Sequence, residues 1–403
     1  MKTTVAVTLA SVLPALAIPL DAPLGKRACS TPPTTVTINN SKLPDPFTFV
    51  SGAKVTTKAD WACRQSEISS LIQNMELGVK PAKPSSVTGS ISGTTLSITA
   101  SDGGNSINFT PSIKYPTSGT APYPAWIGFG GGSLPVPSGV ALINFNNDDI
   151  GAQNDQSSRG KGKFFTLYPN STAGAMTAWA WGVSRIIDVL ESLDVSQSKI
   201  DPTRIAVTGC SRNGKGALVA GALDDRITLT LPQESGSGGS ACWRLSDYEN
   251  NGSTTQAAGE IVQENVWFAS QFNQYAQSPA TVDTLPYDHH LLAGLVAPRA
   301  LLSIDNVGYE WLGPTSIYGC TQTANKIWQA LGVADHMGES QAANHPHCSF
   351  PAEQKADLDA FVQKFLFGQN STNTDFVKTA DFSSNGKPWD PTQWVNWTTP
   401  TLT

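Results

Sequence analysis

Residues 207–217, VTGCSRNGKGA, place a serine between a short β-like run and a run rich in glycine and other small residues. A strand, a sharp turn and a helix in this order are typical of a nucleophile elbow, in which the turn holds the serine hydroxyl above a sheet. The usual pattern is Gly-x-Ser-x-Gly, but here the second glycine, Gly214, comes one position later. A serine at the start of a helix also serves as a helix cap. Ser211 is therefore either a nucleophile or a capping residue.

Strands and helices alternate on both sides of this stretch. The apolar pattern predicts strands at 122–129, 140–145, 205–208, 227–231 and 300–304, and helices at 68–75, 173–193, 211–223 and 323–331. Residues 201–204 predict a turn, and the polar–apolar alternation of residues 86–115, with turns near Gly93 and Gly103, predicts antiparallel strands. We expect an α/β fold: a three-layer sandwich with a mostly parallel, twisted central sheet and an N-terminal antiparallel extension.

The composition narrows the class of protein. The 403 residues are 39% hydrophobic and 14% charged, which is typical of a globular chain. The formal net charge is −6 and no basic block occurs, so neither nucleic acid nor an anionic membrane surface is an expected partner. No apolar run beyond the N-terminus reaches the length of a membrane span.

The first residues have the features of an export signal. Lys2 supplies a positive start, residues 5–17 are apolar, and the small residues at 15–17 suit cleavage. We expect a signal peptide at 1–17, a pro-segment at 18–27 that ends in a dibasic pair, and a secreted, extracellular protein. Residues 28–403 would then form a single catalytic domain. The alternative is that the first residues form a buried N-terminal helix.

Cysteines and glycosylation motifs agree with export. An even number of cysteines in an exported chain predicts disulfides, here with fifteen possible pairings. The six cysteines are Cys29, Cys63, Cys210, Cys242, Cys320 and Cys348. No Cys-x-x-Cys pair occurs, so a zinc site is not expected. Candidate N-glycosylation sites are Asn39, Asn108, Asn170, Asn251, Asn370 and Asn396.

A serine nucleophile needs a base, and three of the five histidines, His336, His345 and His347, come late enough in the chain. Cys210 directly precedes Ser211, and Cys348 directly follows His347. If those two cysteines are bonded, their Cα atoms lie within about 4.4–6.8 Å, which makes Ser211 and His347 neighbours. Alternatively Cys348 pairs elsewhere and His347 is a loop residue, with His345 in reserve.

Position in the sequence does not decide which residue is the acid of the triad or which residues contact the oxyanion. Asp305 and Glu310 follow the strand on which such an acid usually lies, whereas Glu234 ends the strand directly after the elbow and enters the loop SGSGGS. Arg212 follows the serine and is either an oxyanion contact or a surface residue. The run FGGGS at 129–133 either supplies an oxyanion N–H or forms a plain turn.

The stretch GCSRNGKGA at 209–217 resembles the signature of the fungal glucuronoyl esterases, secreted α/β-hydrolases that act on plant cell walls. The resemblance implies an α/β-hydrolase fold and the disulfides Cys29–Cys63, Cys210–Cys348 and Cys242–Cys320. Some relatives carry a cellulose-binding module, but nothing in this sequence resembles one, so we expect no carbohydrate-binding module. The resemblance also implies the triad Ser211, His347 and Glu234, with Arg212 as oxyanion contact. The implied substrate contacts are Lys215, Gln256, Glu264 and Trp311, with Glu260 and Gln263 competing for the roles of 256 and 264.

The resemblance implies an activity as well. The family hydrolyses the ester between (4-O-methyl-)glucuronic acid of glucuronoxylan and a lignin alcohol, through an acyl-enzyme and without a metal or organic cofactor. We expect a monomer. The alternatives are another secreted carbohydrate esterase, such as an acetyl-xylan or feruloyl esterase, and a non-catalytic wall-binding protein.

Overall fold

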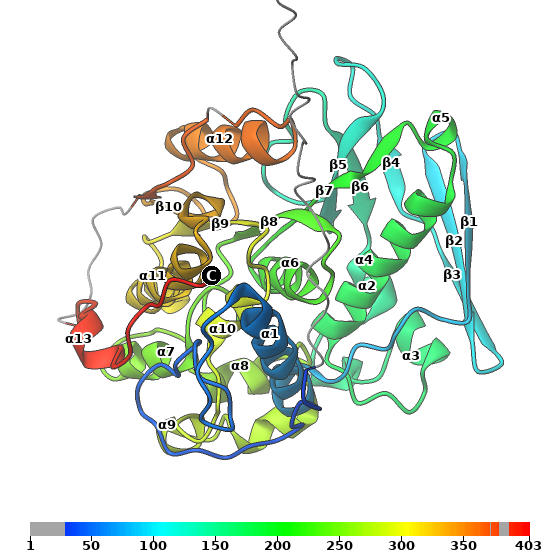
Figure 1. Cartoon of the computed structure of the whole chain (residues 1–403). Coiled ribbons are helices and arrows are strands. Elements are labelled where there is room, and N and C mark those ends of the chain that lie inside the picture. Colours follow the sequence, from blue (N-terminus) through cyan, green and yellow to red (C-terminus); the bar gives the residue numbers. More distant parts are fainter. Residues whose placement is uncertain (1–28, 371, 379–386) are drawn as a thin grey trace, which may run out of the picture.

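The computed structural model describes residues 29–370, 372–378 and 387–403, so the expected signal peptide and pro-segment lie outside the described residues. An eleven-stranded sheet forms its centre (Figure 1). Its strands are β1 Ser86–Ser92, β2 Thr95–Asp102, β3 Asn105–Phe109, β4 Ser112–Lys114, β5 Tyr123–Phe129, β6 Ala141–Phe145, β7 Ile200–Cys210, β8 Ile227–Gln233, β9 Ala300–Asn306, β10 Met337–Ala342 and β11 Val377–Lys378.

The sheet has an antiparallel part and a parallel part. Its order is β1-β2-β4-β6-β5-β7-β8-β9-β10-β11, with β3 paired to β2. Every pair from β6 through β5 to β11 is parallel, whereas β1 to β4 pair antiparallel and form the right-hand edge in Figure 1. The expected mostly parallel α/β sheet with an antiparallel N-terminal extension is confirmed.

Helices cover both faces of the sheet. They are α1 Lys58–Ile72, α2 Asn147–Ile150, α3 Lys163–Leu167, α4 Ala175–Ser192, α5 Val195–Ser198, α6 Arg212–Leu223, α7 Trp243–Asn250, α8 Ala258–Glu264, α9 Pro279–Val282, α10 His289–Gly294, α11 Pro314–Leu331, α12 Lys355–Phe365 and α13 Pro391–Trp394. Strands β8 and β9 lie between α12 and α6 (Figure 1). Among these helices, none is both long enough and apolar enough to span a bilayer.

Alternation along the central strands divides the core into two layers. Val207 of β7 and Leu301 of β9 belong to the large cluster that includes α4 and α6, while their neighbours Ala206 and Leu302 belong to the cluster of α12. Successive side chains of a strand point to opposite faces, so a strand buried on both sides becomes apolar throughout. The carboxyl ends of β7, β8 and β9 therefore meet at one edge of a sheet whose faces are both covered.

Several elements differ from the sequence prediction. Residues 201–204, expected as a turn, lie within β7, but pairing with β5 jumps from Ile200 to Ile205 because Asp201 bonds locally to Thr203 and Arg204. Helices α1 and α11 are longer than predicted, and α1 continues into a π-helical turn at Gln73–Leu77. Strand β10 and helix α12 were not predicted.

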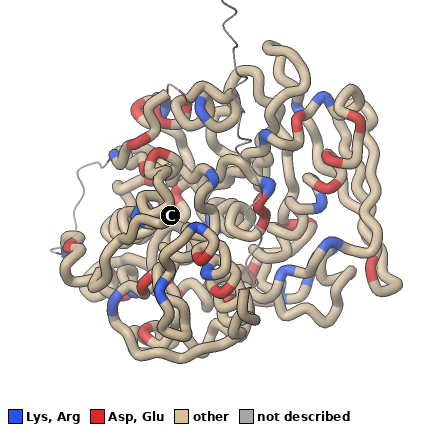
Figure 2. Tube along the Cα trace, in the orientation of Figure 1, with Lys and Arg blue, Asp and Glu red and all other residues tan. Residues whose placement is uncertain are grey.

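The charged residues of the described chain do not gather by sign. Figure 2 shows Lys and Arg interspersed with Asp and Glu over the trace. Several of them form ion pairs, such as Arg226 with Asp188 and with Asp224, each at 2.7 Å. These pairs join α4 to the loop between α6 and β8. None of the three residues belongs to the site around Ser211 that is described below.

Candidate active site

Ser211 lies at a sharp turn between β7 and α6. Its φ of 59° and ψ of −129° are unusual for a residue with a Cβ, and its backbone N–H donates to the Gln233 carbonyl at 2.9 Å. Its side chain makes no capping bond to α6. Strained conformations of this kind cost about 1–3 kcal/mol and concentrate at functional sites. The geometry is that of a nucleophile elbow, and it gives no support to the capping interpretation.

The position of the second glycine has a packing cause. A Cβ at Gly214 would lie 2.6 Å from the Gln233 carbonyl oxygen, because the first turn of α6 packs directly on the end of β8. A Cβ at Gly209 would lie 2.4 Å from the Asn213 carbonyl oxygen. Both glycines are therefore required by close backbone approach around Ser211, although their spacing departs from the usual pattern.

His347 and Glu234 form a short hydrogen bond. His347 Nδ1 lies 2.6 Å from Glu234 Oε2, and the backbone N–H of Cys348 donates to the same oxygen at 3.0 Å. Glu234 directly follows β8 and is 1% exposed. Because a carboxylate only accepts, Nδ1 carries the proton, which leaves the Nε2 lone pair to take a proton from a nucleophile.

A disulfide brings the nucleophile and the base together. Cys210 and Cys348 are bonded with their Cα atoms 5.7 Å apart, and the other bonds are Cys29–Cys63 and Cys242–Cys320, so the pairing implied by the resemblance is confirmed. Ser211 and His347 each adjoin one end of the bond. The sulfurs of this bond lie near His347 in a group with the spacing of metal ligands, but bonded sulfurs are not thiolate ligands.

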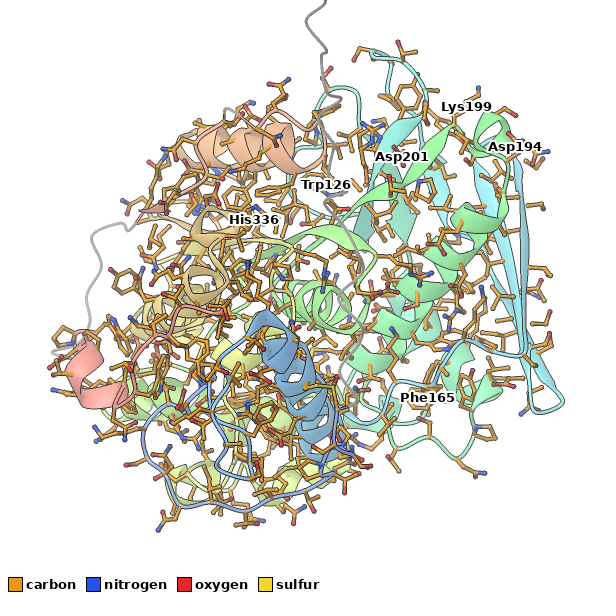
Figure 3. The ribbon with its side chains drawn as sticks, viewed as in Figure 1. Trp126, Phe165, Asp194, Lys199, Asp201 and His336 are labelled. Atoms are coloured by element: carbon orange, nitrogen blue, oxygen red, sulfur yellow. A yellow bond between two sulfur atoms is a disulfide. The ribbon has the colours of Figure 1, made fainter. Side chains whose placement is uncertain are left out.

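The other histidines have different surroundings. His336 lies beside the start of β10 (Figure 3), and its Nδ1 is 2.7 Å from the Pro298 carbonyl, at the opposite edge of the sheet from Glu234. His345 Nδ1 lies 3.9 Å from Glu234 Oε1 and 3.2 Å from Asn306 Nδ2. His345 is therefore near the acid, but only His347 is hydrogen bonded to it.

Asp305 and Glu310, the alternative acids, are engaged elsewhere. Asp305 is fully buried and accepts from Ser303 Oγ at 2.5 Å. Burial, with the nearby Glu339 and Glu234, raises the pKa of Asp305 well above its ordinary value. Glu310 Oε2 accepts from Thr254 Oγ1 at 2.6 Å. Neither carboxyl has a hydrogen bond to His347 among the described contacts.

Two aromatic rings pack on His347. Trp311 lies edge-on at a centroid distance of 4.8 Å and Tyr309 at 5.8 Å. The Tyr309 hydroxyl also accepts the backbone N–H of His347 at 3.1 Å. Sequence analysis missed Tyr309, although it belongs to the stretch GYEWLGP that contains Trp311.

A group of polar side chains lies beside the triad. Lys215 Nζ donates to the carbonyls of Ser235 and Ser237, the latter at 2.7 Å. Burial lowers the pKa of Lys215 to about 8, and the charge of Glu264 opposes that shift. Gln256 Nε2 donates to Glu264 Oε2 at 3.1 Å, and its backbone N–H donates to the Trp311 carbonyl at 3.1 Å. The structure thus brings all four predicted substrate contacts to one side of the site.

Glu260 and Gln263, the competing residues of the same stretch, make different contacts. Glu260 Oε2 accepts the Ala257 N–H at 3.0 Å and so caps its own helix, α8. The Gln263 carbonyl accepts from Gln156 Nε2 at 3.0 Å, and Gln263 itself is exposed. Gln256 and Glu264 are hydrogen bonded to each other, whereas Glu260 is engaged in its own helix cap, and the assignment of 256 and 264 stays a prediction.

Arg212 and the glycine loop at 129–133 are the two candidate oxyanion contacts. Arg212 is exposed at the start of α6, and within the described part of the chain its guanidinium makes no hydrogen bond or ion pair. In the loop at 129–133, Gly130, Gly131 and Gly132 have φ values of 58°, 90° and 73°, and a Cβ at Gly130 would lie 3.1 Å from Asn213 Nδ2. The glycine loop therefore lies next to the first turn of α6.

Comparison with known proteins identifies the family. Residues 98–332 match the family model "Glucuronyl esterase, fungi". A 4-O-methyl-glucuronoyl methylesterase of Hypocrea jecorina is 58% identical over 381 residues, covering 94% of this chain and 80% of the relative. The chain belongs to the fungal glucuronoyl esterases. A methylesterase of Podospora anserina with the same description is 57% identical, over 90% of this chain and 75% of that relative.

Solved structures of glucuronoyl esterases have the same fold. The catalytic domain from Hypocrea jecorina superposes with a TM-score of 0.87 at 57% identity, over 93% of this chain and all of that domain. A Ser→Ala mutant from Sporotrichum thermophile, also with a TM-score of 0.87, is 45% identical and covers 94% of this chain and all of that one. That mutant is in complex with methyl 4-O-methyl-β-D-glucopyranuronate.

In this glucuronoyl esterase, removal of the Cys210–Cys348 bond is expected to lower both stability and turnover. The bond spans 138 residues, so the double variant Cys210→Ser, Cys348→Ser should lose about 3–5 kcal/mol of unfolding free energy. Its kcat should fall about tenfold or more because His347 loses its tether. Thermal melts and initial rates measure the two effects. The control Cys29→Ser, Cys63→Ser should lose stability and keep kcat, and an unchanged kcat in the first variant would contradict the tether.

The six sequon asparagines of the esterase are all exposed. They lie at Asn39, Asn108, Asn170, Asn251, Asn370 and Asn396. Exposure is a condition for glycan attachment, so each site stays a prediction that intact-mass measurement would test.

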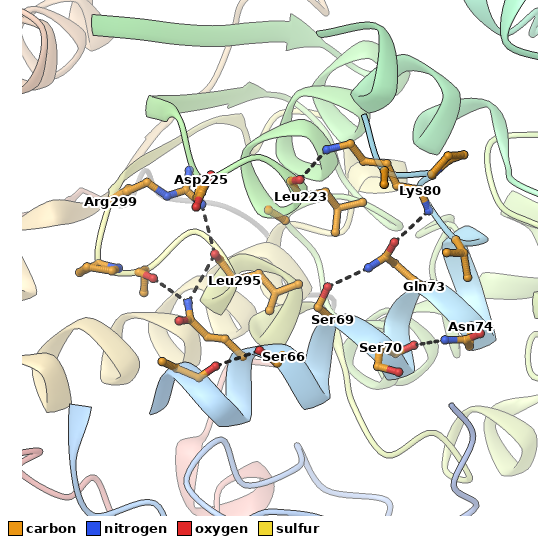
Figure 4. Close-up of a pocket in the computed structure, with 18 residues that line it drawn as sticks. Ser66, Ser69, Ser70, Gln73, Asn74, Lys80, Leu223, Asp225, Leu295 and Arg299 are labelled. Atoms are coloured by element: carbon orange, nitrogen blue, oxygen red, sulfur yellow. Dashed lines mark hydrogen bonds between the residues drawn. The ribbon is translucent and has the colours of Figure 1, made fainter. Parts of the chain in front are cut away.

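A surface hollow of about 930 Å³ lies along α1, and none of its lining residues belongs to the group around Ser211 (Figure 4). Its cations are bonded to main-chain carbonyls: Lys80 Nζ to Leu223 O at 2.6 Å, and Arg299 to four carbonyls that include Gly221 O at 2.7 Å. Gln65 donates to three carbonyls at the end of α10, one of which, Leu295 O, also accepts from Arg299. These bonds join α1, α6 and α10.

Proposed function

We propose that the chain hydrolyses esters of glucuronic acid through a Ser211–His347–Glu234 triad and an acyl-enzyme. The observation that carries this proposal is the 2.6 Å bond between His347 Nδ1 and Glu234, joined to the nucleophile elbow by the adjacent disulfide. Family membership supports the ester class, and the geometry supports the assignment of roles.

The steps follow from the positions of the groups. Ser211 Oγ attacks the ester carbonyl carbon while His347 Nε2 takes its proton, and Glu234 stabilises the imidazolium. The oxyanion accepts hydrogen bonds from backbone N–H groups at the start of α6 and in the glycine loop at 129–133, and the Arg212 cation stabilises its charge. His347 then returns the proton to the leaving alcohol. Water, deprotonated by His347 Nε2, attacks the acyl carbon of the acyl-enzyme. The bond from that carbon to Ser211 Oγ then breaks, His347 returns the proton to Ser211 Oγ, and the uronic acid leaves. Every proton in this scheme is held by protein groups, substrate or water.

The polar group beside the triad suits the acid side of the substrate. Two of the three N–H donors of Lys215 are bonded to carbonyls, which leaves one for a sugar hydroxyl. Glu264 and Gln256 form an exposed acceptor and donor pair at the same place. The Trp311 ring offers an apolar face to the sugar or to the alcohol. A site built for paired hydroxyls discriminates strongly against substrates that lack them.

The natural setting extends this proposal. Glucuronoxylan would supply the acid side and lignin alcohols the leaving group, and the enzyme would act as a secreted monomer. The disulfides support an oxidising compartment. Size-exclusion chromatography with light scattering tests the monomer, and assays on lignin–carbohydrate fractions test the polymer.

The deciding experiment compares benzyl glucuronate with 4-nitrophenyl acetate. We expect cleavage of the glucuronate with little turnover of the acetate. Acetate turnover alone would indicate another class of esterase, and turnover of neither ester would indicate a non-catalytic wall-binding protein.

Glu264→Ala tests the acid side separately. The variant should raise KM for benzyl glucuronate about tenfold, since a hydrogen bond to a charged group contributes about 1.5–3 kcal/mol. Its slow reaction with 4-nitrophenyl acetate should not change, because the acetyl group does not reach Glu264. Equal effects on the two esters would contradict a sugar contact at Glu264. Lys215 is less suitable for this test, because its bonds to Ser235 and Ser237 also hold the loop after Glu234.

A further inference from the structure

Gln233 is a buried residue at the centre of the site that the reaction scheme does not use. It is the last residue of β8, lies directly before Glu234 and is fully buried. A buried side-chain amide needs partners for its oxygen and its N–H groups, and leaving them unpaired is costly. The identity of these partners therefore indicates what the amide does.

All partners of Gln233 belong to segments that build the site. Its Oε1 accepts from Ser133 Oγ at 2.5 Å. Its Nε2 donates to Glu234 Oε1 at 3.3 Å and to the Ser349 carbonyl at 3.2 Å. Its backbone carbonyl accepts the Ser211 N–H at 2.9 Å. These partners determine the orientation of the amide. The carboxylate and the carbonyl can only accept, so they must face Nε2, and the Ser133 hydroxyl donates to Oε1.

The two oxygens of Glu234 have unequal support. Oε2 accepts from His347 Nδ1 and from the Cys348 N–H. Oε1 accepts from Gln233 Nε2, whereas His345 Nδ1 lies 3.9 Å away, beyond hydrogen-bond distance. The Gln233 bond is therefore the contact that holds the plane of the carboxylate while Oε2 faces the imidazole.

We propose that Gln233 is a positioning residue, which aligns the Glu234 carboxylate with His347 and connects that carboxylate to the glycine loop through Ser133. The inference rests on the proposed function, because it assigns Gln233 a task in the triad proposed above. One amide thereby joins the loop at 129–133, the acid and the segment after His347. Small misplacements of catalytic groups cost up to about 100-fold in rate.

Gln233→Met tests the proposal by removing the amide at similar size. We expect kcat for benzyl glucuronate to fall about 10–100-fold, with KM within about twofold, since Gln233 is buried and does not reach substrate. The matched control is Gln65→Met, which removes an amide bonded to three main-chain carbonyls at the hollow along α1. The control should lose stability and keep kcat.

Gln233→Glu gives a signature that a purely structural residue would not give. A protonated Glu at this position can donate to Glu234 Oε1 as the amide does, whereas an ionised one repels it, and two adjacent carboxyls resist double ionisation. The rate relative to wild type, measured from pH 5 to 9, should therefore be highest at low pH and fall as pH rises. The same ratio for Gln233→Met should be flat.

The outcomes separate the two proposals. A wild-type enzyme inactive on glucuronate esters would overturn the proposed function. If the wild type is active, two results would overturn the positioning role alone. One is a kcat of Gln233→Met equal to that of Gln65→Met, and the other is a rate ratio for Gln233→Glu that does not change with pH. If Gln233→Met does not fold, judged by near-ultraviolet circular dichroism, Gln233→Glu decides because it keeps the shape of the side chain.

Discussion

Ser211→Ala is expected to lower kcat for benzyl glucuronate by about 10⁵–10⁶-fold, because no other group replaces the attacking oxygen. The fold should persist, since alanine keeps the Cβ that the turn already accommodates. Initial rates on protein purified away from host esterases measure the effect. Near wild-type turnover in the variant would mean that Ser211 is not the nucleophile.

A glycine at the same position separates strain from chemistry. Ser211 has a φ of 59°, a region that glycine adopts without steric cost. Ser211→Gly should be as inactive as Ser211→Ala but more stable than it, by about 1 kcal/mol. Denaturant melts of the two inactive variants provide the comparison. Equal stability would show that the turn imposes no strain on the side chain.

Glu234→Gln is expected to lower kcat by about 10⁴-fold, because an amide can donate to Nδ1 and so favour the tautomer that leaves a proton on Nε2. The effect should fall on kcat rather than KM, since Glu234 is buried behind His347. Single-turnover rates measure the chemical step directly. A loss below tenfold would show that another carboxyl takes over.

Asp305→Asn is the matched control for this acid. Asp305 is buried and its pKa is raised, so the folded protein holds a proton that the unfolded chain releases above about pH 4. Stability from this group therefore falls as pH rises through that range. The variant should keep kcat within about threefold, and its advantage in unfolding free energy over wild type should grow between pH 4 and 7. A kcat loss equal to that of Glu234→Gln would instead make Asp305 the acid.

The sequence predicted the elbow and the base because their evidence is local. Strand, turn and helix around Ser211 are adjacent in the chain. Cys210 and Cys348, which adjoin Ser211 and His347, predicted that His347 lies near Ser211 if the two cysteines are bonded. The choice between Glu234 and Asp305 needed the family resemblance, since both follow strands that end at the same edge of the sheet. Hydrogen bonding, which separates them in the structure, has no local pattern.

Other features were missed for identifiable reasons. Strand β10, MGESQA, is fully buried although its sequence is polar. Burial is possible because Thr321 Oγ1 donates to Glu339 Oε2 and Gln341 Nε2 donates to Glu339 Oε1. Helix α12 does have apolar residues at helical spacing, with Leu358, Phe361 and Val362 buried, so that signal was present and unused. The role of Gln233 depends on Ser133, which is 100 positions earlier, and no sequence pattern joins them.

The bond between Cys210 and Cys348 also bears on what happens after heating. It closes a ring of chain that contains β8, β9 and β10, and as a covalent bond it survives the loss of folded structure that heat causes. In a melted molecule the residues that flank Ser211 and His347 are still held together, at a local concentration far above that of two free ends. Recovery of activity on cooling should therefore be high in buffer alone and low with dithiothreitol. The covalent ring would therefore preserve the proximity of the two catalytic segments each time the molecule refolds.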